Sequence, residues 1–480
     1  MNRRQFLTGA AGSALRPAAP FFAASGKLRA GSATANISPA LGCSLAGLMT
    51  DRQGTQIHDE LHVRAVALDN GNARIGIAVV DSCAVPRTVI DRAKEMVRAR
   101  SGVPASHLLV SATHTHTAPP AAHLFQSRPD PKYTDWLSVR IADCLQQAFE
   151  RLQPARIGWG VGSEPRLVFN RRYYMKPGTI PADPFGRNTD QVKMNPPAGS
   201  PDIIKAAGPV DPEVSVMAVE SSDSRPIALL VSYALHYVGG TGPGHISADY
   251  FAAWANSITR LAGLAGSRQF PPFVPILANA CSGNINGVNF LGKRVRHEPY
   301  EQMQTYADIL AAECYRTWRT IEFQDNVDIA ASIDEMDMAV RMPSAAEVSA
   351  ARQLLAAAGA PPPNGYTEQP LVYARETVLL SETFPNQVKT FVQALRVGKL
   401  GIATFPGEAF VELGLEVKSK SPFKPTMLIE LANDYRGYLP TVEGHEAGGY
   451  ETWRAKSSYL EKTAAPKFVA SALRQLASLA

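Results

Sequence analysis

The sequence has 480 residues, of which 45% are hydrophobic and 19% charged, so the chain can bury a large core. No run reaches the roughly 18 apolar residues that span a bilayer, which argues against an integral membrane protein. The formal net charge of +5 is small, and no dense Lys/Arg run alternates with aromatic residues, which argues against a nucleic-acid partner. Five widely spaced cysteines without a C-x-x-C pair give neither a cysteine zinc signature nor a disulfide framework.

The N-terminus reads MNRRQFLTGAAGSALRPAAPFFAAS, in which two arginines precede a short apolar stretch rich in alanine and glycine. This arrangement resembles a twin-arginine export signal. We therefore expect residues 1–25 to be an export signal, residues 26–480 to form the folded domain, and the protein to be periplasmic or extracellular.

The first half of the chain alternates strands with helices. Residues 59–83 predict two strands joined by the turn DNGNA. Helical spacing follows over residues 88–102, ending in basic residues and a glycine, and residues 107–113 read as an apolar strand. A second helix is expected over 135–152 and a further strand over 155–162. Strand, helix and strand at this spacing predict a parallel pair within a mixed sheet.

The second half begins with a stretch rich in proline and glycine over residues 170–210, which predicts a long functional excursion rather than a core element. The later elements are more antiparallel. We expect a hairpin formed by 213–221 and 226–240, a strand at 273–281, a strand pair across VGKLG within 388–408, and a strand at 425–434. Helices are expected at 249–266, 301–318, 409–420 and 465–479. The prediction is a single α/β domain with a mixed central β-sheet flanked by helices.

Two of the ten histidines, His114 and His116, lie directly after the apolar strand at 107–113. Residues two apart on a strand face the same side, so one imidazole could bind a metal while the other acts on a substrate. Metal-dependent hydrolases use such a pair, and a structural role is equally compatible with it. Taken singly, His236, Glu408 and the tyrosines near the C-terminus also fit structural roles.

Several separated segments occur in the order found in one family. They are SATHTHTAPP, YALHYVGG followed by GHISADY, FPGEAF, and NDYRGYLPT followed by GGYETW. Together with ANISPALG, IHDELHVRAVAL and FNRRYY, they resemble the neutral ceramidase family from about Ala35 to about Trp453.

The resemblance implies a hydrolase with one catalytic zinc ion that cleaves an N-acyl amide bond in ceramide or a related N-acyl lipid or sugar. It implies four zinc ligands: His114, His236, Glu408 and Tyr438. It implies that His116 and Tyr450 hydrogen-bond the scissile carbonyl, and that Arg171, or its neighbour Arg172, orients the substrate. Asp249 is expected to cap the helix that follows it.

The sequence also departs from the family. Thr117, Ala118, Pro119 and Pro120 follow the histidines where the family is rich in glycine, so the loop is expected to be stiffer. The C-terminal β-sandwich domain typical of ceramidases is not expected after the last predicted helix. The acyl group, the amine and the oligomeric state are left open, as is peripheral contact with a membrane.

Two alternatives differ in class. An amidohydrolase-type barrel, acting on a small amide or ester, also begins with a histidine pair, although the late hairpins argue against it. A non-catalytic exported binding protein that keeps a metal site is the other. Bound metal without turnover would distinguish it from the hydrolase.

Overall fold

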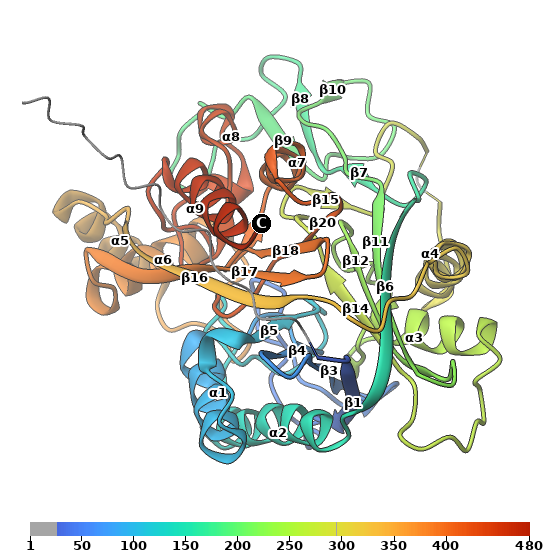
Figure 1. Cartoon of the computed structure of the whole chain (residues 1–480). Helices are drawn as coiled ribbons and strands as arrows, with labels where there is room; N and C mark the ends of the chain where they lie inside the picture. Colours follow the sequence, from blue (N-terminus) through green and yellow to red (C-terminus); the bar gives the residue numbers. More distant parts are fainter. Residues whose placement is uncertain (1–25, 294) are drawn as a thin grey trace, which may run out of the picture.

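A computed structural model describes residues 26–293 and 295–480. The predicted export signal lies outside the described residues. The main element of the fold is an eight-stranded mixed sheet (Figure 1). Its strands, in spatial order, are β14 (Val274–Asn279), β12 (Pro226–Tyr233), β11 (Glu213–Ser221), β6 (Gln153–Ser163), β1 (Arg29–Asn36), β3 (His62–Asp69), β4 (Arg74–Val80) and β5 (Leu108–Ala112).

Two pairs in this sheet are parallel, β4 with β5 and β12 with β14, and each is joined through a helix. The connecting helices are α1 (Arg87–Ser101) and α3 (Tyr250–Leu261). The expected helix end at Gly102 is observed in the left-handed conformation. Asp249 caps α3 as expected, since its carboxylate accepts from the Tyr250 backbone N–H.

A second sheet, which the sequence did not predict as a separate layer, lies across the first (Figure 1). It contains β16 (Ile329–Ala339), β17 (Gln387–Val397), β18 (Leu400–Thr404) and β20 (Thr426–Ile429), in that order. Alternate residues of β17 point to opposite faces: Leu395 and Val397 pack toward the large sheet, whereas Val392 and Ala394 pack toward the C-terminal helix α9 (Ala464–Leu479).

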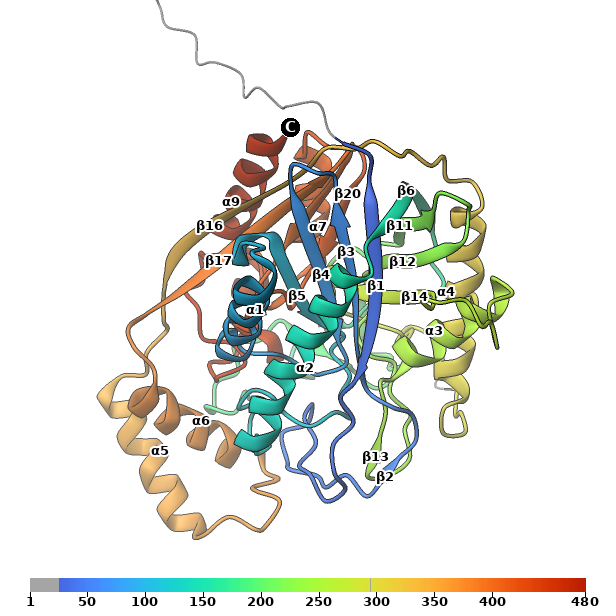
Figure 2. The same cartoon turned by 60° about the horizontal axis from the view of Figure 1, so that its bottom comes forward.

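Helices complete the outer layers. Figure 2 shows α1 and α2 (Pro131–Glu150) over β1 and β3–β5, with α3 and α4 (Glu301–Trp318) beside β12 and β14. Helices α7 (Val411–Lys420) and α9 cover the outer face of the second sheet. The α/β class with a mixed central sheet flanked by helices is confirmed. Among the described residues, no helix is both long and apolar enough to cross a membrane.

The remaining elements surround one end of the two sheets. The excursion over residues 170–210 forms a small antiparallel sheet of β10 (Ile203–Ala206), β8 (Arg172–Met175) and β9 (Val192–Met194), at the top of Figure 1. Helices α5 (Ala345–Ala358) and α6 (Gln369–Thr383), like β16, were not predicted. Short pairs join β2 (Gln56–Ile57) to β13 (His245–Ile246), β7 (Phe169–Asn170) to β15 (Ile285–Asn286), and β19 (Glu408–Ala409) to β21 (Tyr438–Leu439).

Candidate metal centre

The two sheets meet where strands from both of them end. Ser111 on β5 forms an isolated bridge with Ala432, just after β20. The Glu430 N–H donates to the carbonyl of Asn279, at the end of β14. Because carboxyl ends of parallel strands converge here, residues that follow β5, β12, β14 and β18 become neighbours.

His114 enters this junction from a distorted backbone. Strand β5 ends at Ala112, and His114 has a left-handed φ of 68° with its N–H bonded to the carbonyl of Ser82. His114 and His116 therefore do not lie on a strand, and the expectation that strand alternation brings them to one face is wrong. The two side chains still converge, with 3.2 Å between their Nε2 atoms.

His236 and Glu408 join His114 from the other strand ends. His236 follows β12, and Glu408 lies on β19, directly after the second sheet. Glu408 Oε2 lies 3.3 Å from Nε2 of His114 and 3.8 Å from Nε2 of His236. All three side chains are buried.

The remaining bonds of these residues leave the cluster ready for a cation. Nδ1 of His114 donates to the carbonyl of Cys83 at 2.6 Å, and Nδ1 of His236 donates to the carbonyl of Ser282 at 3.2 Å. Each Nε2 therefore faces inward and can ligate a cation once it is deprotonated, as metal-ligating histidines do. Glu408 Oε2 is buried and accepts no hydrogen bond from the described residues. An orphaned carboxylate oxygen between two imidazoles fits a divalent metal, and the three ligand atoms lie within 4.8 Å of one another.

Charges within the cluster are strongly coupled. Burial opposes a charge on His114, but nearby Cys83 and Glu408 outweigh it and raise the pKa of His114 well above its ordinary value. Burial, and then the charge on His114, lower the pKa of His116 and of His236 well below theirs. The charge of Glu408 thus favours a proton on His114 in the metal-free cluster, and a cation bound there would displace that proton.

Tyr438 and Tyr450 lie beside the cluster, with their rings in an edge contact at 5.8 Å between centroids. Tyr438 is buried, and its hydroxyl interacts with Glu408. Burial, and then the negative charge of Glu408, raise the pKa of Tyr438 well above its ordinary value. Its phenol is therefore neutral in the metal-free protein, and it could act as a ligand only when a cation lowers that pKa.

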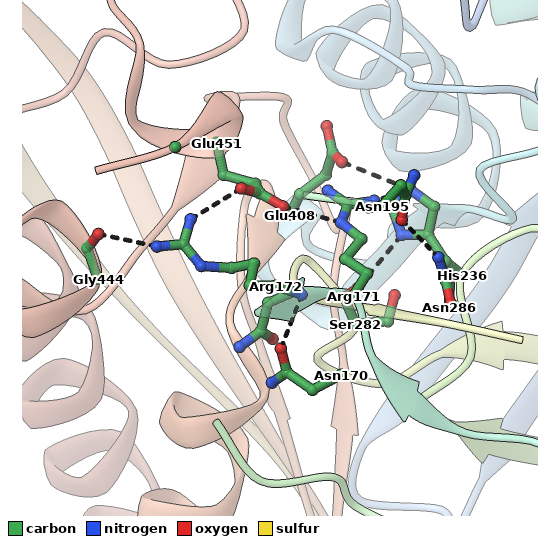
Figure 3. Close-up of polar contacts among 12 residues, drawn as sticks. Asn170, Arg171, Arg172, Asn195, His236, Ser282, Asn286, Glu408, Gly444 and Glu451 are labelled. Atoms are coloured by element: carbon green, nitrogen blue, oxygen red, sulfur yellow. Dashed lines mark hydrogen bonds and ion pairs between the residues drawn. The ribbon is translucent and has the colours of Figure 1, made fainter. Parts of the chain in front are cut away.

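The side chains of Arg171 and Arg172 point in opposite directions, as Figure 3 shows. Nη1 of Arg171 points to His236 Nε2 at 3.3 Å, and the guanidinium lies 5.4 Å from the ring centroid of Tyr438. Arg172 turns away and donates to the carbonyls of Gly444 and Gly448. Arg171 is therefore the arginine at the cluster, and its buried Nη2 has no acceptor among the described residues.

Four further residues shape the site, and the sequence analysis did not single them out. Glu451 accepts from both Arg171 and Arg172, Tyr435 donates to Glu408 Oε1 at 2.8 Å, and the Tyr237 ring stacks on His116 at 3.7 Å between centroids. Gly47 has a φ of 101° and packs so closely on His116 that a side chain there would overlap it. Tyr237, Tyr435 and Glu451 lie inside the quoted motifs YALHYVGG, NDYRGYLPT and GGYETW, and this is the signal that could have found them.

The fold defined by this geometry is that of the neutral ceramidases. The neutral ceramidase structure from Pseudomonas aeruginosa matches over 94% of this chain and 74% of its own, with a TM-score of 0.70 and 18% sequence identity. A ceramidase structure complexed with C2 matches over 94% of this chain and 75% of its own, with a TM-score of 0.69 and 18% identity. No protein-family model matches the sequence, and no curated protein matches it either. The resemblance expected from the motifs is thus confirmed at the level of the fold.

Proposed function

We propose that the protein is a zinc-dependent hydrolase that cleaves the N-acyl amide bond of ceramide or of a related N-acyl lipid or N-acyl sugar. The observation that carries this proposal is the orphaned Glu408 oxygen between the inward-facing nitrogens of His114 and His236. It lies within the fold shared with the two ceramidase structures.

His114, His236, Glu408 and Tyr438 would hold the metal. A zinc ion bound there would polarise the scissile carbonyl and activate water, which is the chemistry that catalytic zinc supplies. Three donors come from histidine and carboxylate, and the phenol of Tyr438 is the fourth. The Nδ1 bonds of both histidines to backbone carbonyls fix their tautomers and ring directions before a metal arrives.

The neighbouring side chains would act on the carbonyl. Its oxygen becomes negatively charged during attack and needs donors already in place. Nε2 of His116 lies 3.2 Å from Nε2 of His114, and the ring of Tyr450 contacts the ring of Tyr438. Both contacts support the proposal that these two residues donate to the carbonyl oxygen. Arg171, fixed by Glu451 through Nε at 2.9 Å, has its free Nη2 to orient a polar group of the substrate.

Metal content and hydrolysis test the proposal together. The mature protein should contain one zinc per chain and cleave at least one member of a chain-length series of N-acyl amines, and a chelator should abolish cleavage. His114→Ala should lose both zinc and activity, whereas His123→Ala, an exposed histidine outside the cluster, should keep both. Zinc without cleavage of any amide or ester would favour the non-catalytic binding protein, and absence of zinc would contradict the metal site.

Export is a separate part of the proposal. Residues 1–25 would direct folded, metal-loaded protein across the membrane, and the twin arginines Arg3 and Arg4 would be required. Replacing both by lysine should retain the protein in the cytoplasm with its precursor length, as fractionation and mass spectrometry would show. Unchanged export of that variant would reject the signal.

A further inference from the structure

A group of basic side chains surrounds a small cavity next to the turn that carries Tyr450. This turn, η2 (Tyr450–Thr452), contributes Thr452 to the wall. The cavity has a volume of about 180 Å³. Its lining residues come from five separate parts of the chain: Phe185, Arg187, Arg341, Glu347, Thr452, Arg454 and Lys462.

Carboxylates compensate only part of this positive charge. Arg187 pairs with Asp183 at 2.7 Å, and Arg454 pairs with Glu347 at 2.8 Å. Arg341 donates to backbone carbonyls and a serine hydroxyl, and neither Arg341 nor Lys462 pairs with a carboxylate in the described part of the chain. Two of the four cations therefore face the cavity without a counter-charge.

The same wall holds a donor that is not used. Nε of Arg454 is buried and meets no acceptor among the described residues. The guanidinium groups of Arg187 and Arg454 lie 4.8 and 5.9 Å from the ring centroid of Phe185, so one aromatic ring positions both of them.

The excess charge affects neighbouring titratable groups. Burial, and then the charges of Arg454 and Arg187, lower the pKa of Arg341 to about 10. Burial, and then Arg341 and Lys462, lower the pKa of His445 to about 3. Like charges this close repel one another, and an anion bound among them would relieve that repulsion.

The geometry points to a binding site for a tetrahedral oxyanion, a phosphate or sulfate group, held by Arg187, Arg454 and Lys462 in this cavity. Guanidinium groups bind such oxygens through paired N–H donors, and Lys462 adds a flexible charge. The volume corresponds to about six water molecules at about 30 Å³ each, which leaves room for one such group with bridging water.

This site would fasten the excursion around Arg187 to the turn bearing Tyr450. Trp453, between Thr452 and Arg454, already donates to Asp190 of the same excursion at 2.8 Å. A bound oxyanion would add a second connection next to it. The inference rests on the basic cavity alone and stands whether or not the chain hydrolyses amides.

Phosphate binding to the mature protein tests the inference directly. Isothermal titration with inorganic phosphate, at constant ionic strength set by chloride, should give saturable binding near one equivalent. Lys462 is exposed, so Lys462→Ala should fold normally and weaken binding about 10- to 100-fold, the usual effect of one charge-assisted hydrogen bond. Lys467→Ala, on α9 and paired with Glu461 at 2.8 Å, is the matched control and should bind as the wild type does.

A diester separates the two sources of the group. Dimethyl phosphate binding as well as inorganic phosphate would assign the site to a phosphodiester such as a lipid headgroup, whereas selective binding of inorganic phosphate or sulfate would assign it to a free ion. No saturable binding of either, or equal binding by wild type and Lys462→Ala, would overturn the inference.

Discussion

Glu408 and Tyr438 are direct partners in the parallel ladder between β19 and β21. The Glu408 N–H bonds to the carbonyl of Gly437, and the Tyr438 N–H bonds to the carbonyl of Ser457. A single backbone pairing therefore sets the positions of two proposed ligands, Glu408 on β19 and Tyr438 on β21. Tyr435, three residues before Tyr438, adds a hydroxyl bond to the same carboxylate.

This bond predicts the effect of Tyr435→Phe. Its hydroxyl orients Glu408 without entering the metal cluster, and removing such a supporting bond typically costs about 10- to 100-fold in metal affinity or activity. Zinc affinity should fall by that range in competition with a chromophoric chelator. Tyr459→Phe, which removes a buried hydroxyl bonded to Arg436 instead, should leave the affinity near that of the wild type.

His116 and His114 are expected to separate catalysis from metal binding. His116→Ala should keep stoichiometric zinc and lose about 100- to 1000-fold in turnover, because it would remove the proposed donor to the developing oxyanion. His114→Ala should lose zinc as well. Elemental analysis of each purified variant beside its hydrolysis rate checks this, and full zinc-dependent activity in His114→Ala would contradict the ligand assignment.

Gly47 offers a test of how tightly His116 must be held. At Gly47→Ala the new Cβ would overlap the backbone and ring base of His116, so the imidazole must move, and kcat should fall while zinc content stays unchanged. Gly42→Ala is the matched control: it has a similar positive φ of 87° but faces open space. Backbone strain should cost each variant about 1 kcal/mol of stability. Gly47→Ala should lose more than this, because its new Cβ would overlap His116 Cα and Cβ, and only Gly47→Ala should lose activity. Equal activity in the two variants would show that His116 tolerates displacement.

Glu451 is fully buried and holds Arg171 and Arg172 together through charge-assisted bonds of 2.9 and 2.7 Å. Glu451→Gln removes the carboxylate that bonds both buried guanidinium groups, so the free energy of unfolding should fall by about 3–5 kcal/mol. Urea denaturation measures this loss. Because Glu451→Gln also releases Arg171, the proposed substrate-orienting residue, KM for the substrate should rise in the same variant. The exposed Glu443→Gln should change neither the stability nor KM.

Lys94 predicts a pH-dependent stability. It is buried on α1, its Nζ donates to Asn433 at 2.7 Å, and burial lowers its pKa to about 7. The unfolded chain keeps this proton up to about pH 10.4. Between these values the unfolded state binds more protons, so stability should rise with pH by up to about 1.4 kcal/mol per pH unit.

Lys94→Met should remove that slope between pH 7 and 10, as urea denaturation across the range would show. The exposed Lys399→Met should keep the wild-type slope. The same slope of stability against pH in the wild type, Lys94→Met and Lys399→Met would contradict the role of Lys94.

The sequence predicted what local patterns encode. The hairpin of β11 and β12, the pair β17 and β18, and the crossover through α1 all follow apolar periodicity and turn residues, and all are observed. Strand β16 (Ile329–Ala339) was missed because few of its residues are buried. Between Ile329 and Met338 they are half-buried or exposed, so the sequence lacks the clear apolar alternation of a strand with one buried face. Its pairing with β17 is long-range and leaves no local signal.

The candidate site shows the same limit. Motifs placed His114, His236 and Glu408 in one cluster, and the structure brings them together. The sequence around Arg171 and Arg172 does not show which of them lies at the cluster. Even in the structure both are buried and both donate to Glu451. Their opposite directions depend on where helix α8 (Val442–Ala447) and its C-cap Gly448 pack, which only the tertiary structure determines.

The junction of the two sheets also has a consequence for biogenesis. His114 is synthesised early, whereas Glu408 and Tyr438 emerge from the ribosome near the end of translation, after most of the large sheet exists. The proposed ligand set therefore cannot be complete on a partly synthesised chain, and binding of a metal by these residues would be among the last events of maturation. Loss of the metal would accordingly report failed docking of the second sheet sooner than loss of secondary structure would.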